Sequence, residues 1–189
     1  DISDAYRKQL KLTLESFREQ ASEIRADALT EENRFSLLVF QYMVQTELDG
    51  LVFPEHLLPM DQMNCLPADF AQWGAGESAH PFRTVTDYDN FLKRIDGLES
   101  WVNTAMENMD KGIRMKVVLP RLIVTRTIQR LKPLLVEEPE DSEFYRPVRN
   151  MPGAFSAEDR ERLTAAYTMA IRDRILPTYR KLVHFLETA

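Results

Sequence analysis

Apolar residues recur along most of this chain at alternating spacings of three and four, the period of a helix with one buried face. The first such face has lysine, arginine, glutamate and glutamine between its members, which are Leu10, Leu14, Phe17, Ala21, Ile24 and Ala28. This stripe predicts a helix from about Ser3 to Ala28. It covers less than three heptads, which favours packing in a bundle over a free coiled coil.

The next segment predicts the most buried helix of the chain. Thr30 is its expected cap, and Glu31 and Glu32 lie in its first turn, where the helix dipole favours anions. Between Phe35 and Val52 both sides are apolar: Phe35, Leu38, Val39 and Tyr42 on one, and Leu37, Phe40, Val44 and Leu48 on the other. A helix that is apolar all round is typically buried between neighbours.

The helical period then breaks from Phe53 to Val85, where four prolines and two glycines interrupt the chain. A loop of this length in a compact domain usually has a function or is held in place by packing against the domain. Phe70, Trp73 and Phe82 favour a loop that packs on a helical surface. The alternative is a ligand groove lined by these aromatic rings.

The second half of the chain predicts several further helices. Thr86 with Asp89 resembles a capping box, and the apolar face that follows reaches Ile113, with Gly97 as a place where the helix can divide. Pro120 suits the first turn of the next helix. Ser156 with Asp159 caps the last helix, which Pro177 should kink or divide.

No segment has the period of two that indicates a strand. We therefore expect an all-α fold, an antiparallel bundle of five to seven helices with one long ordered loop, forming a single helical domain over residues 1–189.

Composition narrows the class of protein. With 189 residues, 44% of them hydrophobic and 29% charged, the chain is globular rather than disordered. A net charge of −6 argues against nucleic acid as a partner, because binding phosphates needs a concentrated basic face. There is no apolar run of about 18 residues, so no transmembrane helix is expected. The only cysteine, Cys65, excludes an intrachain disulfide and reads as a small buried residue.

Candidate catalytic chemistry is sparse. His56, His80 and His184 are isolated from one another, and no His-Glu-x-x-His motif is present. Since a zinc site needs three or four converging ligands, we assign no metal ligand and no cofactor to this chain. Nothing near Cys65 lowers the pKa of its thiol in the way a catalytic cysteine needs, so no catalytic residue is assigned either.

Three cations surround the start of the helix at Pro120 and form the candidate binding site. Arg114, Lys116 and Arg121 can hold an anion or a peptide carboxylate beside a helix N-terminus, or they can form a solvated face with intrahelical ion pairs. Arg126 and Arg130, four residues apart, need acidic neighbours, which residues 137–143 or another helix can supply.

Several segments resemble one family when taken in order. They are ENRFSLLVFQYMVQTELDG, TVTDYDNFLKRIDGL, GIRMKVVLPRLIVTRTIQRL and ILPTYRKLVHFL, with the markers Asp87-Tyr88, Arg94, Gly112, Pro120-Arg121 and Pro177-x-Tyr179-Arg180. From about Glu31 to the end, the chain resembles the N-terminal helical part of the DUF885 family of bacterial proteins. Lys116 stands where a second glycine is expected and Thr178 where alanine is usual.

The resemblance implies a function for a longer parent protein. The family is similar to gluzincin zinc peptidases, often lipoproteins of the bacterial envelope or periplasm, whose His-Glu-x-x-His helix would lie beyond this chain. The chain would then be a non-catalytic helical wall of a peptide substrate cleft, inactive alone, whose partner is the missing C-terminal catalytic half. The alternative is a freestanding helical interaction module.

A half-protein would also expose the apolar surface that its other half covers. We therefore expect self-association, most simply as a two-fold dimer. Its expected interface includes the C-terminal helix and the loop aromatics, through Leu176, Tyr179, Val183, Leu186, Trp73 and Phe82.

Overall fold

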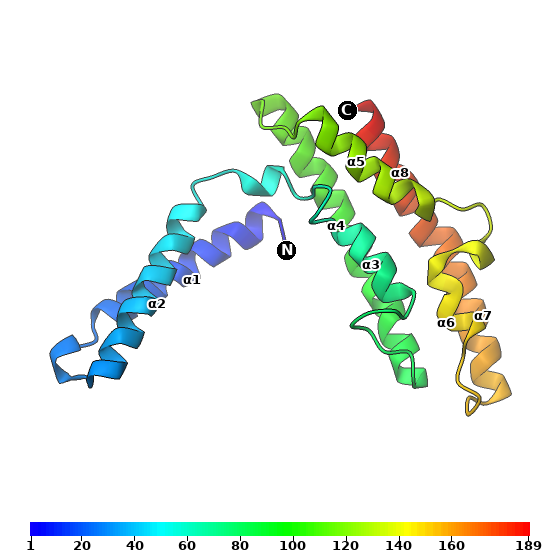
Figure 1. Cartoon of the computed structure of the whole chain (residues 1–189), viewed down its shortest axis with the longest axis horizontal. Helices are drawn as coiled ribbons and strands as arrows, with labels where there is room; N and C mark the ends of the chain where they lie inside the picture. The colour runs from blue at the N-terminus through cyan, green and yellow to red at the C-terminus, as the bar shows by residue number, and fades with distance from the viewer. The chain divides into compact units, whose positions relative to one another are not determined.

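The computed structural model describes residues 1–189 and confirms the all-α fold, with 75% of the residues helical and no strand. The contacts within the chain gather into two compact units, Asp1–His56 and Leu57–Ala189, where the sequence suggested one domain. Figure 1 traces the helices of both units along the chain, from blue at the N-terminus to red at the C-terminus.

The first unit is a helical hairpin of α1 (Asp4–Ser22) and α2 (Glu31–Gly50), joined through a 3₁₀ turn at Ala26–Ala28. Each helix begins at a hydroxyl cap. The Ser3 hydroxyl accepts the amide N–H of Tyr6 at 3.2 Å, and the Thr30 hydroxyl accepts that of Asn33 at 3.3 Å. The cap predicted at Thr30 is therefore confirmed, whereas α1 ends six residues before the predicted boundary at Ala28 because the turn intervenes.

The prediction that α2 is the most buried helix is wrong. Within this unit only Leu14, Ala21 and Val44 are buried apolar residues, and they lie where the two helices face each other. Phe35 is 69% exposed and Leu38 59% exposed. The apolar pattern on both sides of α2 was correct, but only the side that faces α1 is covered.

The second unit is built around α4 (Val85–Met115), a helix about 46 Å long at the usual rise per residue. The other helices of this unit are α3 (Leu66–Gly74), α5 (Arg121–Leu131), the short α6 (Arg146–Arg149), α7 (Ala157–Ala170) and α8 (Leu176–Thr188). α4 packs against α3, α7 and α8, and α5 packs along α8 (Figure 1).

The ends and interruptions of these helices differ in part from the prediction. α4 begins two residues early, at a capping box of Thr84 and Asp87 rather than Thr86 and Asp89. Gly97 does not divide α4, which continues through it. The cap at Ser156 is confirmed, and the disturbance expected at Pro177 takes the form of a π-helical turn at Ile171–Ile175 between α7 and α8. Proline lacks the N–H that an uninterrupted α-helix would use there.

The core of the second unit lies where α4, α7 and α8 meet. Its largest fully buried side chains include Phe91, Ile95, Leu163, Tyr167, Ile175, Leu176, Tyr179 and Leu182. Leu176, Tyr179 and Val183, which we expected to form a self-association surface, are buried inside this unit. These three residues therefore cannot contribute to the expected interface, whereas Leu186, Trp73 and Phe82 stay partly exposed and self-association stays a prediction.

Three buried tyrosine hydroxyls join the helices across this core. Tyr88 donates to the carbonyl oxygen of Pro147 at 2.8 Å, Tyr167 to that of Tyr88 at 3.1 Å, and Tyr179 to that of Pro67 at 2.6 Å. Burial raises the pKa of Tyr88 to about 12 and raises those of Tyr167 and Tyr179 as well. Each buried hydroxyl thus has a backbone acceptor and is not left without a partner.

The segment predicted as one long loop is ordered, but it contains α3. Phe70 is buried, with its ring 5.1 Å from that of Phe91, and the Phe82 ring lies 5.0 Å from that of Tyr88. These rings pack between α3 and α4, and Phe82 also lines a small pocket with His80 and Arg83. The packing of Phe70 and Phe82 on α4 confirms that this segment is held against the helical surface, and the ligand groove at these rings stays a prediction.

Candidate functional site: an apolar groove

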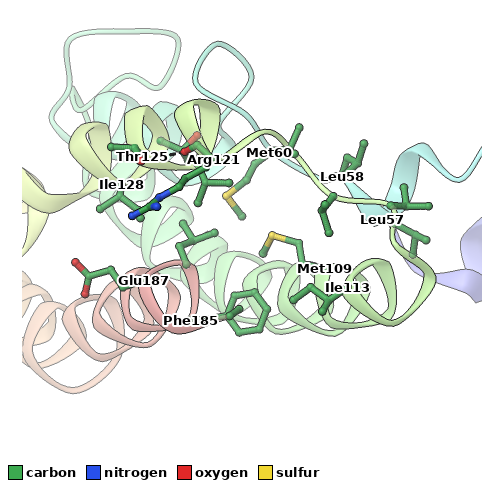
Figure 2. Close-up of a pocket in the computed structure, with 17 residues that line it drawn as sticks. Leu57, Leu58, Met60, Met109, Ile113, Arg121, Thr125, Ile128, Phe185 and Glu187 are labelled. Atoms are coloured by element: carbon green, nitrogen blue, oxygen red, sulfur yellow. Dashed lines mark hydrogen bonds between the residues drawn. The ribbon is translucent and has the colours of Figure 1, made fainter.

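The second unit has an open groove with a volume of about 750 Å³. It lies between the C-terminal half of α4, the segment from Val117 to Leu119, α5 and the end of α8 (Figure 2). Most of its lining is apolar: Leu57, Leu58, Met60, Met109, Ile113, Val117, Val118, Leu119, Val124, Ile128, Phe185 and Leu186. Figure 2 shows Met60 and Met109 pointing toward each other across it. Its size and apolar character are typical of a ligand pocket.

A reversal of the chain at the end of α4 shapes one side of this groove. The N–H of Val117 donates to the carbonyl oxygen of Gly112 at 2.9 Å, and the N–H of Lys116 donates to that of Ile113 at 3.2 Å. Lys116 has φ 61°, so the turn is a Schellman motif with a lysine where glycine is usual. The turn brings the Val117 carbonyl over Gly112, where an added Cβ would lie 2.6 Å from that oxygen.

Polar residues reach the groove from α5 and α8. Arg121 is exposed at the start of α5 and its guanidinium has no hydrogen-bond or ion-pair partner within the chain. Glu187 of α8 is already paired, with its carboxylate 2.7 Å from the ammonium of Lys132. The groove therefore combines an apolar surface with one unpaired cation, which suits an apolar ligand that carries a carboxylate.

The structure does not join the three predicted cations in one site. Arg114 forms an ion pair with Asp110 one turn earlier in α4, which is the intrahelical pairing of the alternative interpretation. Lys116 occupies the left-handed position of the turn and does not line the groove. Arg121 alone lines it. The apolar walls were not recognised from the sequence, because they come from four segments that no motif connects.

The partners of the next two arginines come from α3 and the segment just before it rather than from the acidic residues 137–143. Arg130 lies 2.8 Å from the carboxylate of Asp69 and also donates to the carbonyl oxygens of Gln62 and Met63. Arg126 donates to the Gln62 side chain at 3.2 Å. The alternative source, another helix, was correct for Arg130, and these bonds hold α5 against the segment before α3.

The histidines and the cysteine lie apart. The His56 imidazole is 3.6 Å from the carboxylate of Asp4, His80 lies 3.0 Å from the carbonyl oxygen of Asp87, and His184 is exposed. Cys65 is buried as predicted, and burial raises the pKa of its thiol. No three His, Cys, Asp or Glu side chains are placed to hold a metal ion. The residues of this chain therefore do not fit a zinc site.

Comparisons with known proteins identify one family. A family model described as "Bacterial protein of unknown function (DUF885)" matches residues 1–189. No curated protein and no solved structure matches the chain. None of the helices combines the length and the apolar character that crossing a membrane requires.

Proposed function

Because this chain belongs to the DUF885 family, we propose that it is the non-catalytic helical region of a zinc metallopeptidase-like protein of the bacterial envelope. In this proposal the groove forms one wall of a peptide substrate cleft. The zinc ligands and the general base belong to a C-terminal catalytic half of the parent protein, since the residues of this chain do not fit a zinc site.

The observation that carries this proposal is the groove with its unpaired arginine. The apolar side chains of an extended peptide would pack on groove residues such as Val118 and Ile128 and bury their exposed apolar surface. The Arg121 guanidinium would pair with a carboxylate of the peptide, which accepts two parallel N–H bonds from this group. The candidate site thus keeps Arg121 alone of the three predicted cations.

The location of the parent protein is also a proposal. We place it in the bacterial envelope or periplasm, held by a lipid anchor in its full-length form, on the family resemblance alone. Fractionation of cells that express the full-length protein tests this. A protein that sediments with the membrane fraction and is released by detergent agrees with the proposal, whereas a protein in the cytoplasmic fraction contradicts it.

Peptide binding to the full 189-residue chain tests the groove. The probe is a short fluorescein-labelled peptide rich in leucine with a free C-terminal carboxylate, followed by fluorescence anisotropy. Val118→Asp places a charge in the groove and should weaken binding by about tenfold or more. Leu122→Asp is the matched control, because Leu122 is 60% exposed against 58% for Val118 and lies outside the groove.

A second pair of measurements tests the role of Arg121. Arg121→Gln should weaken binding of the free carboxylate and leave binding of the C-terminally amidated peptide unchanged. Equal losses for both peptides contradict a carboxylate contact. Equal binding by Val118→Asp and Leu122→Asp contradicts the groove and favours the alternative, a freestanding helical interaction module.

A further inference from the structure

The outward face of α2 carries a second apolar surface, in the other unit of the chain. Five of its residues share that face, at spacings of three and four along the helix, and we name them the α2 stripe: Phe35, Leu38, Val39, Tyr42 and Met43. Tyr42 is 73% exposed and the others range from 40% to 69%. Contiguous apolar surface of this kind on a folded protein marks an interaction site more often than chance exposure.

Nothing within the hairpin covers this stripe. The residues of α2 that turn toward α1 are Leu37, Gln41, Val44 and Leu48, on the opposite side of the helix. Gln41 donates to the carbonyl oxygen of Ala21 at 3.0 Å, which fixes that side against α1. The rotation of α2 is thereby set, and the α2 stripe is held outward.

The charges that α2 itself carries on its outward face have one sign. Glu31 and Glu32 lie in the first turn of α2, and Asp49 lies in its last turn on the same outward face. These two acidic ends are about 27 Å apart at the rise of an α-helix. The only cation of the helix, Arg34, lies to the side and donates to the carbonyl oxygen of Ala26 at 3.3 Å.

We propose that the α2 stripe binds an amphipathic helix of a partner protein whose apolar face has lysine or arginine near both ends. A helix fits because the stripe follows the three- and four-residue ridges that another helix packs between. Basic residues fit because they would meet Glu31 and Glu32 at one end and Asp49 at the other.

The same charges disfavour two other occupants. In a second copy packed antiparallel through this face, Glu31 and Glu32 would approach Asp49 of the other copy at both ends, and like charges oppose that contact. A bacterial membrane surface rich in anionic lipids repels an acidic face, since peripheral helices that bind such lipids are basic.

Two synthetic helical peptides test the proposal against the full 189-residue chain. They share one leucine stripe and differ only at the ends, which carry lysine in one peptide and glutamate in the other. Fluorescence anisotropy at low salt should show that the lysine peptide binds about tenfold or more tightly than the glutamate peptide. In the double variant Glu32→Lys/Asp49→Lys this preference should reverse.

Tyr42→Asp separates docking from general attraction to an acidic protein. The added negative charge would strengthen purely electrostatic binding of the lysine peptide, whereas docking on the α2 stripe predicts about a tenfold loss. Leu12→Asp in α1 is the matched control, because it adds the same charge at another exposed apolar residue of the same unit and should leave binding within about twofold. Leu38→Gln, which keeps helix propensity and adds no charge, should lose binding as Tyr42→Asp does.

Several results would overturn the proposal. They are equal binding of both peptides, no binding of either, or a Tyr42→Asp protein that binds the lysine peptide as tightly as the unmodified chain. A dimer at the assay concentration that Leu38→Gln dissociates would assign the α2 stripe to a second copy. Binding to anionic lipid vesicles that Tyr42→Asp abolishes would assign it to a membrane.

Discussion

Two glycines of α4 should respond to alanine in opposite directions. At Gly97, which is exposed, an added Cβ meets nothing within 4 Å. Alanine there should therefore stabilise the protein by about 0.5–1 kcal/mol, the difference in helix propensity between the two residues. At Gly112, which is buried, the new Cβ would lie 2.6 Å from the Val117 carbonyl oxygen and 3.3 Å from that of Leu57.

The clash at Gly112 cannot be relieved by rotating a side chain, because both oxygens belong to the backbone. The Val117 carbonyl is held there by the Schellman turn, whose bond from the Val117 N–H to Gly112 would have to lengthen. Crowding of this kind typically costs about 1–3 kcal/mol, against a gain of about 1 kcal/mol in helix propensity. We expect Gly112→Ala to destabilise the chain by up to about 2 kcal/mol, which separates the two variants by up to about 3 kcal/mol.

Tryptophan fluorescence during urea and thermal unfolding measures this difference. Both tryptophans, Trp73 and Trp101, belong to the second unit and report on its unfolding. A change of 1 kcal/mol shifts the midpoint of a domain of this size by about 2–4 °C, so the two variants should melt on either side of the unmodified chain. A Gly112→Ala protein that melts at or above the unmodified temperature would refute the close approach. A Gly97→Ala protein that melts below it would refute the open position of Gly97.

Four further predictions concern the core, the tyrosines, activity and association. Phe91→Ala should cost about 3–5 kcal/mol in the unfolding of the second unit, whereas Leu38→Ala should stay within about 0.5 kcal/mol; equal losses in urea melts would place the core elsewhere. Burial raises the pKa values of Tyr88, Tyr167 and Tyr179 in the folded state. The contribution of these tyrosines to stability is therefore complete below about pH 10, the pKa of an unfolded tyrosine. It is lost as the pH rises through the folded-state pKa, which is about 12 for Tyr88. Absorbance of tyrosinate and circular dichroism should therefore change together in that alkaline range, and ionisation of all six tyrosines before unfolding would argue against the buried hydroxyl bonds. The chain alone should not hydrolyse peptides and added zinc should change nothing; chelator-sensitive cleavage by pure protein would contradict this. At low salt the chain should not form dimers through the α2 stripe, because Glu31 and Glu32 would approach Asp49 of the other copy; light scattering that shows low-salt dimers which Leu38→Gln dissociates would contradict this.

The helical period of the sequence predicted the fold class and several helix boundaries. Thr30 and Ser156 cap the helices predicted from them, because a hydroxyl followed by acidic residues is a local signal that needs no tertiary information. Thr84 and Thr86 each have an aspartate three residues later. The choice of Thr84 follows from the packing of His80 and Phe82 just before the helix, which sequence spacing alone does not contain.

Burial was harder to predict than secondary structure. Apolar residues on both sides of α2 indicated a helix between two neighbours, but a period does not say whether the second neighbour lies in the same chain. The reverse error concerned α8, where Leu176 and Tyr179 looked available for association and are covered by α4 and α3. Both errors have one cause. An apolar stripe on a helix predicts that the stripe is covered, but it does not identify the segment or molecule that covers it.

The candidate site was predictable only in part. Of the three cations around Pro120 only Arg121 lines the groove, and Gly112 and Lys116 mark the turn that shapes it. Its walls combine Leu57, the end of α4, α5 and Phe185 of α8, which lie far apart in the sequence. No spacing rule connects such residues, so the groove became visible only with the fold.

Methyl NMR spectra of the 189-residue chain test most directly whether the groove binds a peptide. They are recorded while an apolar peptide with a free carboxylate is added. Methyl groups line the groove at Met109, Val118, Val124 and Ile128, and the α2 stripe carries its own at Leu38 and Val39. The proposed peptide cleft predicts shifts at the four groove residues and none at Leu38 or Val39. Shifts confined to the α2 stripe, or a groove whose signals do not move, would contradict it.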